Sequence, residues 1–416
     1  MRDLMLTMAA ACAIIPFAAQ AQTGPEDPGM PDPAQVGLAL DAQPTVLAAQ
    51  ARVNAAEAQA RALARGPHEI TASGTYIRRD VVREKTFNEY DVQLTRAIRL
   101  PGKARLDREI GSYGITAAEN MAEDMRHQSA IALSESWWDW LSAARQAQID
   151  RDAVANYEKL RSAVRRMEEL REASRLEVDQ AEASLALARL AAERSAGEAA
   201  VARGRLSTRF PAVLPAGGAP DIPEPVLPDE GLEQLGRLVV SRSHEIAAAD
   251  ADASRAGALA ARTRKDRMAD PSVGLRVFSE RDGDERGAGV LFSIPLGGGH
   301  RKALAEQSAA EASAASAELA AVRWDIAEMA STDVERARYA YAAWQAARTG
   351  LNAQIAALEK LRIGYRAGEI DLSDQLLGER QAHDAIRSEA EARAEAMRAL
   401  TRLRIDSHMI WIGEDD

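Results

Sequence analysis

Apolar and polar residues alternate in four short segments of the chain, at 69–79, 87–99, 272–280 and 287–295. Alternation at period two puts successive side chains on opposite faces of a strand, so these segments are predicted β-strands with one apolar face. A charged loop separates the first two segments, and another separates the last two. The pattern therefore predicts two β-hairpins in widely separated parts of the sequence.

Long stretches without proline follow these hairpins. No proline occurs between Lys103 and Leu170, which allows roughly 100 Å of continuous helix at about 1.5 Å per residue. Apolar residues recur there every three or four positions, as in coiled-coil seams. The seams comprise Val154, Tyr157, Leu160, Val164 and Met167 in the first half, and Leu351, Ile355, Leu358, Leu361 and Tyr365 in the second. We expect helical hairpins that pack against partners along their whole length.

The two halves of the chain share one order of patterns. Alanine-rich segments 43–65 and 243–265 each precede a hairpin, and each hairpin leads into a long helix through a short loop. The strand-to-helix junctions contain Leu100, Pro101 and Gly102 in the first copy, and Pro295, Gly297, Gly298 and Gly299 in the second. The glycine run lacks the spacing of a phosphate-binding loop. We predict a two-fold repeat, 22–209 and 232–416, joined by a Pro/Gly-rich linker at 210–231 that packs outside the helical body.

The predicted strands have the length of membrane-spanning strands, which need about ten residues with one apolar and one polar side. In that case lipid contacts Tyr90, Val92, Leu94, Val290, Phe292 and Ile294. A soluble hairpin with one buried face gives the same alternation. Phe87 and Phe278 lie near the charged loops, where an interfacial aromatic girdle is expected, and they favour the membrane alternative. Four strands cannot close a barrel, so an oligomer has to supply the remaining strands.

Composition and charge narrow the class of protein. The 416-residue chain has a formal net charge of −11 and only 4% aromatic residues. The negative charge argues against nucleic acid as a partner, because neutralising phosphates requires a basic surface. The small number of aromatic residues argues against a conventional large core and favours helices packed through small side chains.

The first 21 residues have the pattern of a signal peptide. A mostly apolar stretch follows Arg2 and ends in Ala-Gln-Ala, which predicts cleavage between Ala21 and Gln22. Cys12 is the only cysteine and leaves lipoprotein processing open as an alternative. Beyond this segment no run of about 18 apolar residues is present to form a transmembrane helix.

Candidate catalytic and metal-binding residues form no recognisable motif. The six histidines show no HxxxH or Cys/His spacing, so we expect no metal site and no cofactor. Three tryptophans in 136–140 could stack on a ligand, but their place on a long helix is more typical of packing between helices. Glu369, Asp371 and Asp374 have no nucleophile beside them and are interpreted as a solvated turn. Asp371 and Ser373 are the candidate caps of the next helix. These residues therefore give no sign of an active site.

The repeat and three motifs together resemble the TolC-like outer-membrane efflux family. The motifs are IRLPGKAR (98–105), IPLGGGHR (294–301) and YRAGEIDLSDQLL (365–377). The resemblance implies a mainly α fold with a small β part. Long antiparallel helical hairpins would form a periplasmic α-barrel, and four strands per chain would contribute to a trimeric twelve-stranded barrel in the outer membrane. The linker would then lie near the equatorial region of the molecule.

The same resemblance implies partners and docking residues. The homotrimer would do no chemistry and would receive substrates from a periplasmic adaptor protein and an inner-membrane resistance-nodulation-division transporter. The implied adaptor-docking tips contain Tyr365, Gly368, Asp371 and Asp374 in the second half, and Arg171, Ser174 and Glu177 in the first, where Arg171 stands at the glycine position.

The cargo and the class of function stay open at this point. The first junction is most similar to the branch of the family that exports heavy-metal cations such as cobalt, zinc, cadmium or copper. The outer-membrane component of a type I protein secretion system has the same implied fold. A structural coiled-coil protein without a pore is a third possibility. The alternation in the predicted strands and the charged loops argue against it.

Overall fold

The computed structural model describes residues 29–412. The predicted signal peptide, the cleavage site between Ala21 and Gln22, and Cys12 lie outside the described residues. So do the first residues of the predicted repeat.

The elements follow the same order in both halves of the chain. The first half contains α1 (Pro33–Asp41), α2 (Pro44–Arg65), β1 (Thr71–Asp80), β2 (Thr86–Ala97), α3 (Lys103–Glu169) and α4 (Arg175–Arg209). After the short 3-10 helix η1 (Pro211–Val213), the second half contains α5 (Leu232–Ser241), α6 (His244–Asp266), β3 (Ser272–Glu280), η2 (Arg281–Gly283), β4 (Glu285–Ser293), α7 (Gly299–Arg366) and α8 (Leu372–Asp406).

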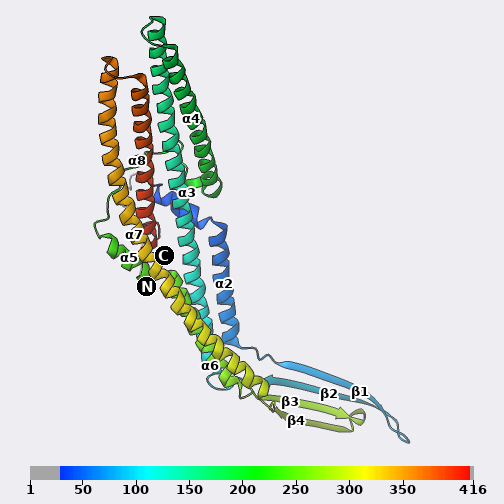
Figure 1. Ribbon diagram of the computed structural model, residues 1–416. Helices are drawn as coiled ribbons and strands as arrows, with labels where there is room; N and C mark the ends of the chain where they lie inside the picture. The colour runs from blue at the N-terminus through cyan, green and yellow to red at the C-terminus, as the bar shows by residue number, and fades with distance from the viewer. Residues whose placement is uncertain (1–28, 413–416) are drawn as a thin grey trace, which may run out of the picture.

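The molecule is elongated, with helical hairpins at one end and a sheet at the other (Figure 1). α3 has 67 residues and α7 has 68, which corresponds to roughly 100 Å for each helix. α2 packs against α3, and α6 packs against both α3 and α7. The predicted seam residues of α3 and α7 are buried or half-buried. The expectation of long helices packed along an apolar seam is therefore confirmed.

All four strands form one antiparallel sheet in the order β1-β2-β3-β4. Pairing of β2 with β3 joins the two hairpins, with Val92 opposite Val277 and Gln93 opposite Arg276. This register puts the apolar sides of both hairpins on the same face, and a slip of one residue would mix the faces. β1 and β4 are the edges, and within the described chain neither has a strand on its outer side.

Three tryptophans form the centre of the core. Trp137, Trp138 and Trp140 of α3 are buried, and the indole N–H of Trp138 donates to Thr401 Oγ1 of α8 at 3.2 Å. Residues of α1, α4 and α8 complete this cluster. The interpretation of these tryptophans as packing between helices is confirmed.

The linker at 210–231 is partly buried. Phe210, Val213 and Ile222 are at most 6% exposed and belong to the tryptophan cluster, whereas Val226 is 77% exposed. The expectation that the linker packs outside the helical body is therefore wrong for these three residues. Their apolar side chains gain more from contact with the indole rings than from exposure to water.

Candidate channel-forming surfaces and helical tips

One face of the sheet is a continuous apolar surface, which we call the apolar face. The register assigns to it Tyr76, Tyr90, Val92, Leu94, Val273, Leu275, Val277, Val290 and Phe292. These side chains are between 37% and 78% exposed. Ile294 is 50% exposed but follows the last residue of β4. An exposed apolar surface of this extent marks contact with lipid or with another protein.

The opposite face of the sheet is polar. Arg276 of β3 forms an ion pair with Asp91 of β2, and Gln93 donates to the same carboxylate at 2.9 Å. Near the sheet's far end Arg79 of β1 donates to Glu89 of β2. One apolar and one polar side is the arrangement of a strand between lipid and a wet lumen.

Two phenylalanines lie on the polar face, not on the apolar one. Phe87 is 4% exposed, and the cationic groups of Lys85 and Arg281 each lie 5.3 Å from its ring centroid. The guanidinium of Arg276 lies 5.1 Å from the ring of Phe278. The expectation that Phe87 and Phe278 belong to an interfacial girdle is therefore wrong. The ring of Phe87 instead attracts cations of the two loops, and the ring of Phe278 attracts Arg276 of its own strand.

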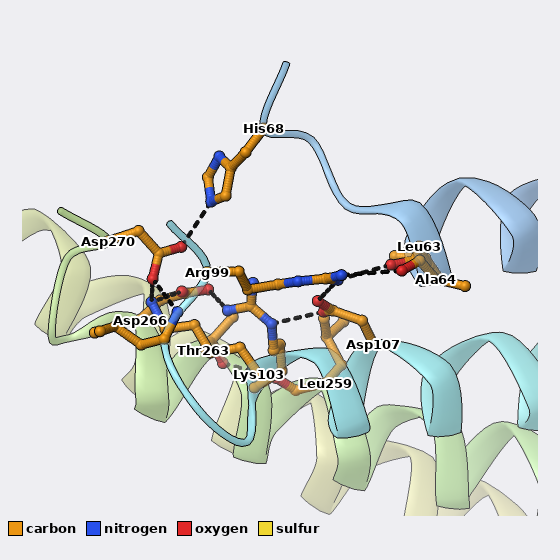
Figure 2. Close-up of polar contacts among 12 residues, drawn as sticks. Leu63, Ala64, His68, Arg99, Lys103, Asp107, Leu259, Thr263, Asp266 and Asp270 are labelled. Atoms are coloured by element: carbon orange, nitrogen blue, oxygen red, sulfur yellow. Dashed lines mark hydrogen bonds and ion pairs between the residues drawn. The ribbon is translucent and has the colours of Figure 1, made fainter. Parts of the chain in front are cut away.

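A buried ion-pair network fixes the first strand-to-helix junction (Figure 2). Lys103 is 1% exposed, and its ammonium nitrogen lies 2.8 Å from a carboxylate oxygen of Asp266 and 2.8 Å from one of Asp270. It also donates to the carbonyl of Met268 at 2.9 Å. Burial alone would raise the pKa of Asp270. Hydrogen bonds from Lys103 and from the Leu100 N–H outweigh burial and lower that pKa.

A second group of charges lies beside Lys103 (Figure 2). Arg99 donates to Asp107 at 2.7 Å and to the carbonyls of Leu63 and Ala64, at the end of α2, at 2.9 Å each. Arg262 of α6 donates to the other oxygen of Asp107 at 2.6 Å. The guanidinium of Arg99 thus neutralises the negative end of the α2 dipole. The junction ties α2 and α3 of the first half to α6 of the second.

The second junction is exposed. Pro295 and the three glycines are on the surface, and Leu296 is 93% exposed. Gly297 has a φ of 94°, which glycine adopts without steric cost. Arg301 donates to the backbone oxygens of Arg267 and Gly297. The two copies of the junction therefore share a chain path but differ in burial, and the exposed copy adjoins the edge strand β4.

Both helical hairpins end in the same turn. At the second tip the N–H groups of Gly368 and Glu369 bond to carbonyls three and five residues earlier, at 3.0 and 2.9 Å. At the first tip Arg171 and Glu172 do the same, both at 2.8 Å. This is the Schellman motif. Gly368 has a φ of 72° and Arg171 one of 63°, so the absence of glycine at 171 leaves the turn geometry unchanged.

The two tips contact each other through an apolar cluster of Val164, Val178, Ala181 and Leu372, against which Tyr365 packs. Burial raises the pKa of Tyr365, and the charge of Glu177 from the other hairpin adds to the rise. The remaining predicted tip residues are exposed, namely Gly368, Asp371, Asp374, Arg171 and Ser174.

The second helices of the two hairpins begin differently. Ser174 and Glu177 form a capping box, in which Ser174 Oγ accepts from the Glu177 N–H at 3.3 Å and the Glu177 carboxylate accepts from the Ser174 N–H at 2.6 Å. Asp371 occupies the N-cap position of α8, but its side chain makes no capping hydrogen bond. The expectation of a side-chain cap is wrong there, because an exposed carboxylate is satisfied by water at little cost.

Sequence reasoning missed a polar cluster between α3 and α6. Asp124, His127 and Glu245 place ligand-type atoms within 4.8 Å of one another. Burial raises the pKa of Asp124 to about 6, and the charge of Glu245 adds to the rise. Beside them the rings of His244 and His408 stack at 4.9 Å, and burial lowers the pKa of His408 to about 4. The only indication of this cluster in the sequence was the spacing of Asp124 and His127, which lie one turn apart on α3.

A buried acid pair joins α7 and α8. Burial raises the pKa of Asp333 to about 6, and the charge of Asp406 adds to the rise. Arg402 and Arg336 lie 3.6 and 3.1 Å from the carboxylate of Asp333 and partly offset both effects.

No protein-family model and no curated protein matches the chain. Solved structures do match. A membrane protein from Pseudomonas aeruginosa has a TM-score of 0.73 at 19% identity, over 90% of this chain and 92% of that one. The outer membrane protein VceC from Vibrio cholerae has a TM-score of 0.71 at 15% identity, over 92% and 96%. The open state of the Neisseria gonorrhoeae MtrE outer membrane channel has a TM-score of 0.71 at 17% identity, over 90% and 88%.

These likenesses confirm the fold, a mainly helical chain with one four-stranded antiparallel sheet. The three neighbours are described as a membrane protein, an outer membrane protein and an outer membrane channel. Across residues 29–412, every helix is too short or too polar to cross a bilayer.

Proposed function

We propose that three copies of this chain form the outer-membrane exit duct of a tripartite efflux pump. The observation that carries the proposal is the sheet, with its exposed apolar face, its polar face and two edge strands that lack partners in the described chain. Unpaired edges are too costly to persist in lipid. Three sheets joined edge to edge close into a twelve-stranded barrel, with the apolar face toward lipid and the polar face toward the lumen.

The sheet-proximal part of α7 supports the same assembly. Residues 299–325 of this helix are alanine-rich and mostly exposed, next to the exposed junction and the edge strand β4. An alanine surface lets neighbouring helices approach closely. We place this surface against the next protomer, where it continues the barrel as a helical tunnel.

The tips of the two hairpins are the proposed docking site for a periplasmic adaptor, which connects the duct to a resistance-nodulation-division transporter in the inner membrane. The exposed turns at Arg171 and Gly368 lie at the end of the molecule farthest from the sheet (Figure 1). Heavy-metal cations are the proposed cargo, because the first junction resembles that of the heavy-metal branch of the TolC-like family. A wide duct passes such ions without a tight binding site on its wall.

Membrane fractionation and resistance together test this function. The full chain is produced in a Gram-negative host that lacks its own export channels, with and without an adaptor and a metal-type transporter. We expect the chain in the outer membrane and metal resistance only when all three proteins are present. Recovery of the chain in the soluble or inner-membrane fraction, or resistance without the chain, would contradict the proposal.

Docking at the tips has its own test with a matched control. Neither Gly368 nor Gly350 has an atom within 4 Å of where a Cβ would lie, but only Gly368 has a positive φ. Arginine tolerates the same conformation at the first tip, but a β-branched side chain does not. Gly368→Val should therefore distort the tip turn, keep outer-membrane trimer levels, and abolish resistance and adaptor crosslinking. Gly350→Val, on the helix surface, should preserve all three. Full resistance in Gly368→Val, or loss of its trimer, would show that the tip is assigned wrongly.

A further inference from the structure

Asp124 and His127 of α3 meet Glu245 of α6 in a cluster of a size that fits one cation. We propose that this cluster binds a divalent transition-metal ion of the zinc class and so links the two halves of each chain. The ion is resident within the protomer and is distinct from any transported substrate. A site here does not depend on the export function.

His127 supplies the nitrogen ligand. Its side chain is 3% exposed, and its Nε2–H donates to Asp406 Oδ1 at 2.9 Å. Because a carboxylate only accepts hydrogen bonds, this contact assigns the ring proton to Nε2 and leaves a lone pair on Nδ1. Nδ1 has no hydrogen-bond partner among the described residues. A buried acceptor without a partner is costly, and a metal bond satisfies it.

Two carboxylates lie around that lone pair. Glu245 Oε1 is 3.9 Å from His127 Nδ1, and the ligand atoms of all three side chains lie within 4.8 Å of one another. Ligand atoms at about 2.0–2.1 Å from a tetrahedral zinc ion are roughly 3.4 Å apart, so side-chain shifts of about 1 Å close the site. Asp124 and Glu245 are half-buried, which gives the ion access from water. The fourth position is left for a water molecule.

Each carboxylate ligand also has an outer hydrogen bond. Gln128 Nε2 donates to Asp124 Oδ1 at 3.3 Å, and Ser243 Oγ donates to Glu245 Oε2 at 2.7 Å. The second contact leaves Oε1 of Glu245 facing His127. Outer partners of this kind, together with the carboxylate behind the histidine, orient metal ligands and fix the imidazole tautomer. One imidazole with two carboxylates suits zinc, cobalt or nickel better than magnesium, which prefers oxygen ligands alone.

Metal titration of the full-length protein tests the site. The protein is purified in detergent, stripped of metal with a chelator, and titrated with zinc chloride by calorimetry. We expect one zinc ion per chain, with no competition from a thousandfold excess of magnesium chloride. Wild-type protein that binds no zinc, or loses it to magnesium, would overturn the proposal.

Charge-removing variants locate the ion. Asp124→Asn and Glu245→Gln should each weaken zinc binding at least tenfold, and Asp406→Asn should weaken it about 10- to 100-fold through the histidine. Glu119→Gln removes an exposed charge from the same helix and should bind like wild type. Unchanged affinity in both ligand variants, with helicity retained, would overturn the assignment.

Zinc-edge X-ray absorption of the wild-type protein gives a readout that needs no variant. A first shell with one imidazole and otherwise oxygen ligands at about 2.0 Å supports the site. A shell with two or more imidazoles, or with no imidazole, contradicts it.

Discussion

Lys103→Met tests the junction network, because it removes one buried charge and keeps the length of the side chain. Removing one partner of a buried ion pair typically costs about 3–5 kcal/mol. Asp266 is 40% exposed and keeps its ion pair with Arg262, so water and Arg262 reduce the cost of losing the Lys103 charge there. Asp270 is 10% exposed and keeps its hydrogen bonds with His68 and with the Leu100 N–H. We therefore expect the lower end of the range, about 3 kcal/mol.

Hydrogen exchange at the junction measures this cost locally. The Ile98 N–H bonds to the Pro271 carbonyl at 2.8 Å, and the Leu100 N–H bonds to Asp270 at 3.0 Å. If local opening becomes easier by about 3 kcal/mol, exchange of these amides speeds up roughly 150-fold. Lys302→Met is the control, because Lys302 is 64% exposed at the second junction and pairs with Glu306 at 3.7 Å. Acceleration of less than about fivefold in Lys103→Met, or equal acceleration in both variants, would refute the reasoning.

Three further predictions concern the sheet, the first tip and pH. Val92→Arg puts a charge on the apolar face and should deplete the outer membrane of assembled protein, at a cost of about 2–4 kcal/mol near the bilayer midplane, whereas Gln93→Arg on the polar face should assemble normally. Equal depletion in immunoblots of outer membranes would contradict this. Arg171→Gly relieves a left-handed conformation and should stabilise the first tip by about 0.5–1 kcal/mol, seen as slower hydrogen exchange there; faster exchange would count against it. The pKa of Asp333 rises from 3.8 to about 6 on folding, so the folded protein binds this proton more tightly than the unfolded chain does. Proton binding at Asp333 therefore contributes fully to the free energy of unfolding below about pH 4, and this contribution, up to about 3 kcal/mol, is lost as the pH rises through 6. Asp333→Asn should flatten the dependence of the thermal midpoint between pH 4 and 7, and an unchanged slope would be evidence against this origin.

The periodic parts of the fold could be predicted because one short pattern determines each of them. The proline-free stretch after Lys103 and its apolar seam predicted α3, which ends at Glu169. Alternation alone placed Val92 and Val290 on one face, and the observed register agrees. Phe87 is an odd-numbered residue of β2, like Asp91 and Gln93, so the same alternation predicts its place on the polar face.

Contacts between distant segments could not be predicted in the same way. The burial of Lys103 was not predicted, because its partners Asp266 and Asp270 come from the other half of the chain. The cluster of Asp124 and Glu245 could not be predicted for the same reason. Metal-binding motifs are recognised by local spacing, and these residues meet only when α6 packs on α3. Tertiary packing, rather than local propensity, determines both.

Crosslinking between edge strands is the most direct test of the central claim that each chain supplies one third of a closed channel. In a Cys12→Ser background, cysteine is placed at Thr75 in the middle of β1 and, in separate variants, at Gly287, Gly289 or Leu291 of β4. All four positions are on the polar face. Adjacent antiparallel strands bring such pairs to about 5.5 Å between Cα atoms, within disulfide range. The account predicts that at least one variant, oxidised in intact outer membranes, runs as a covalent trimer with no larger species. Only monomer in all three variants, or an open ladder beyond the trimer, would contradict it.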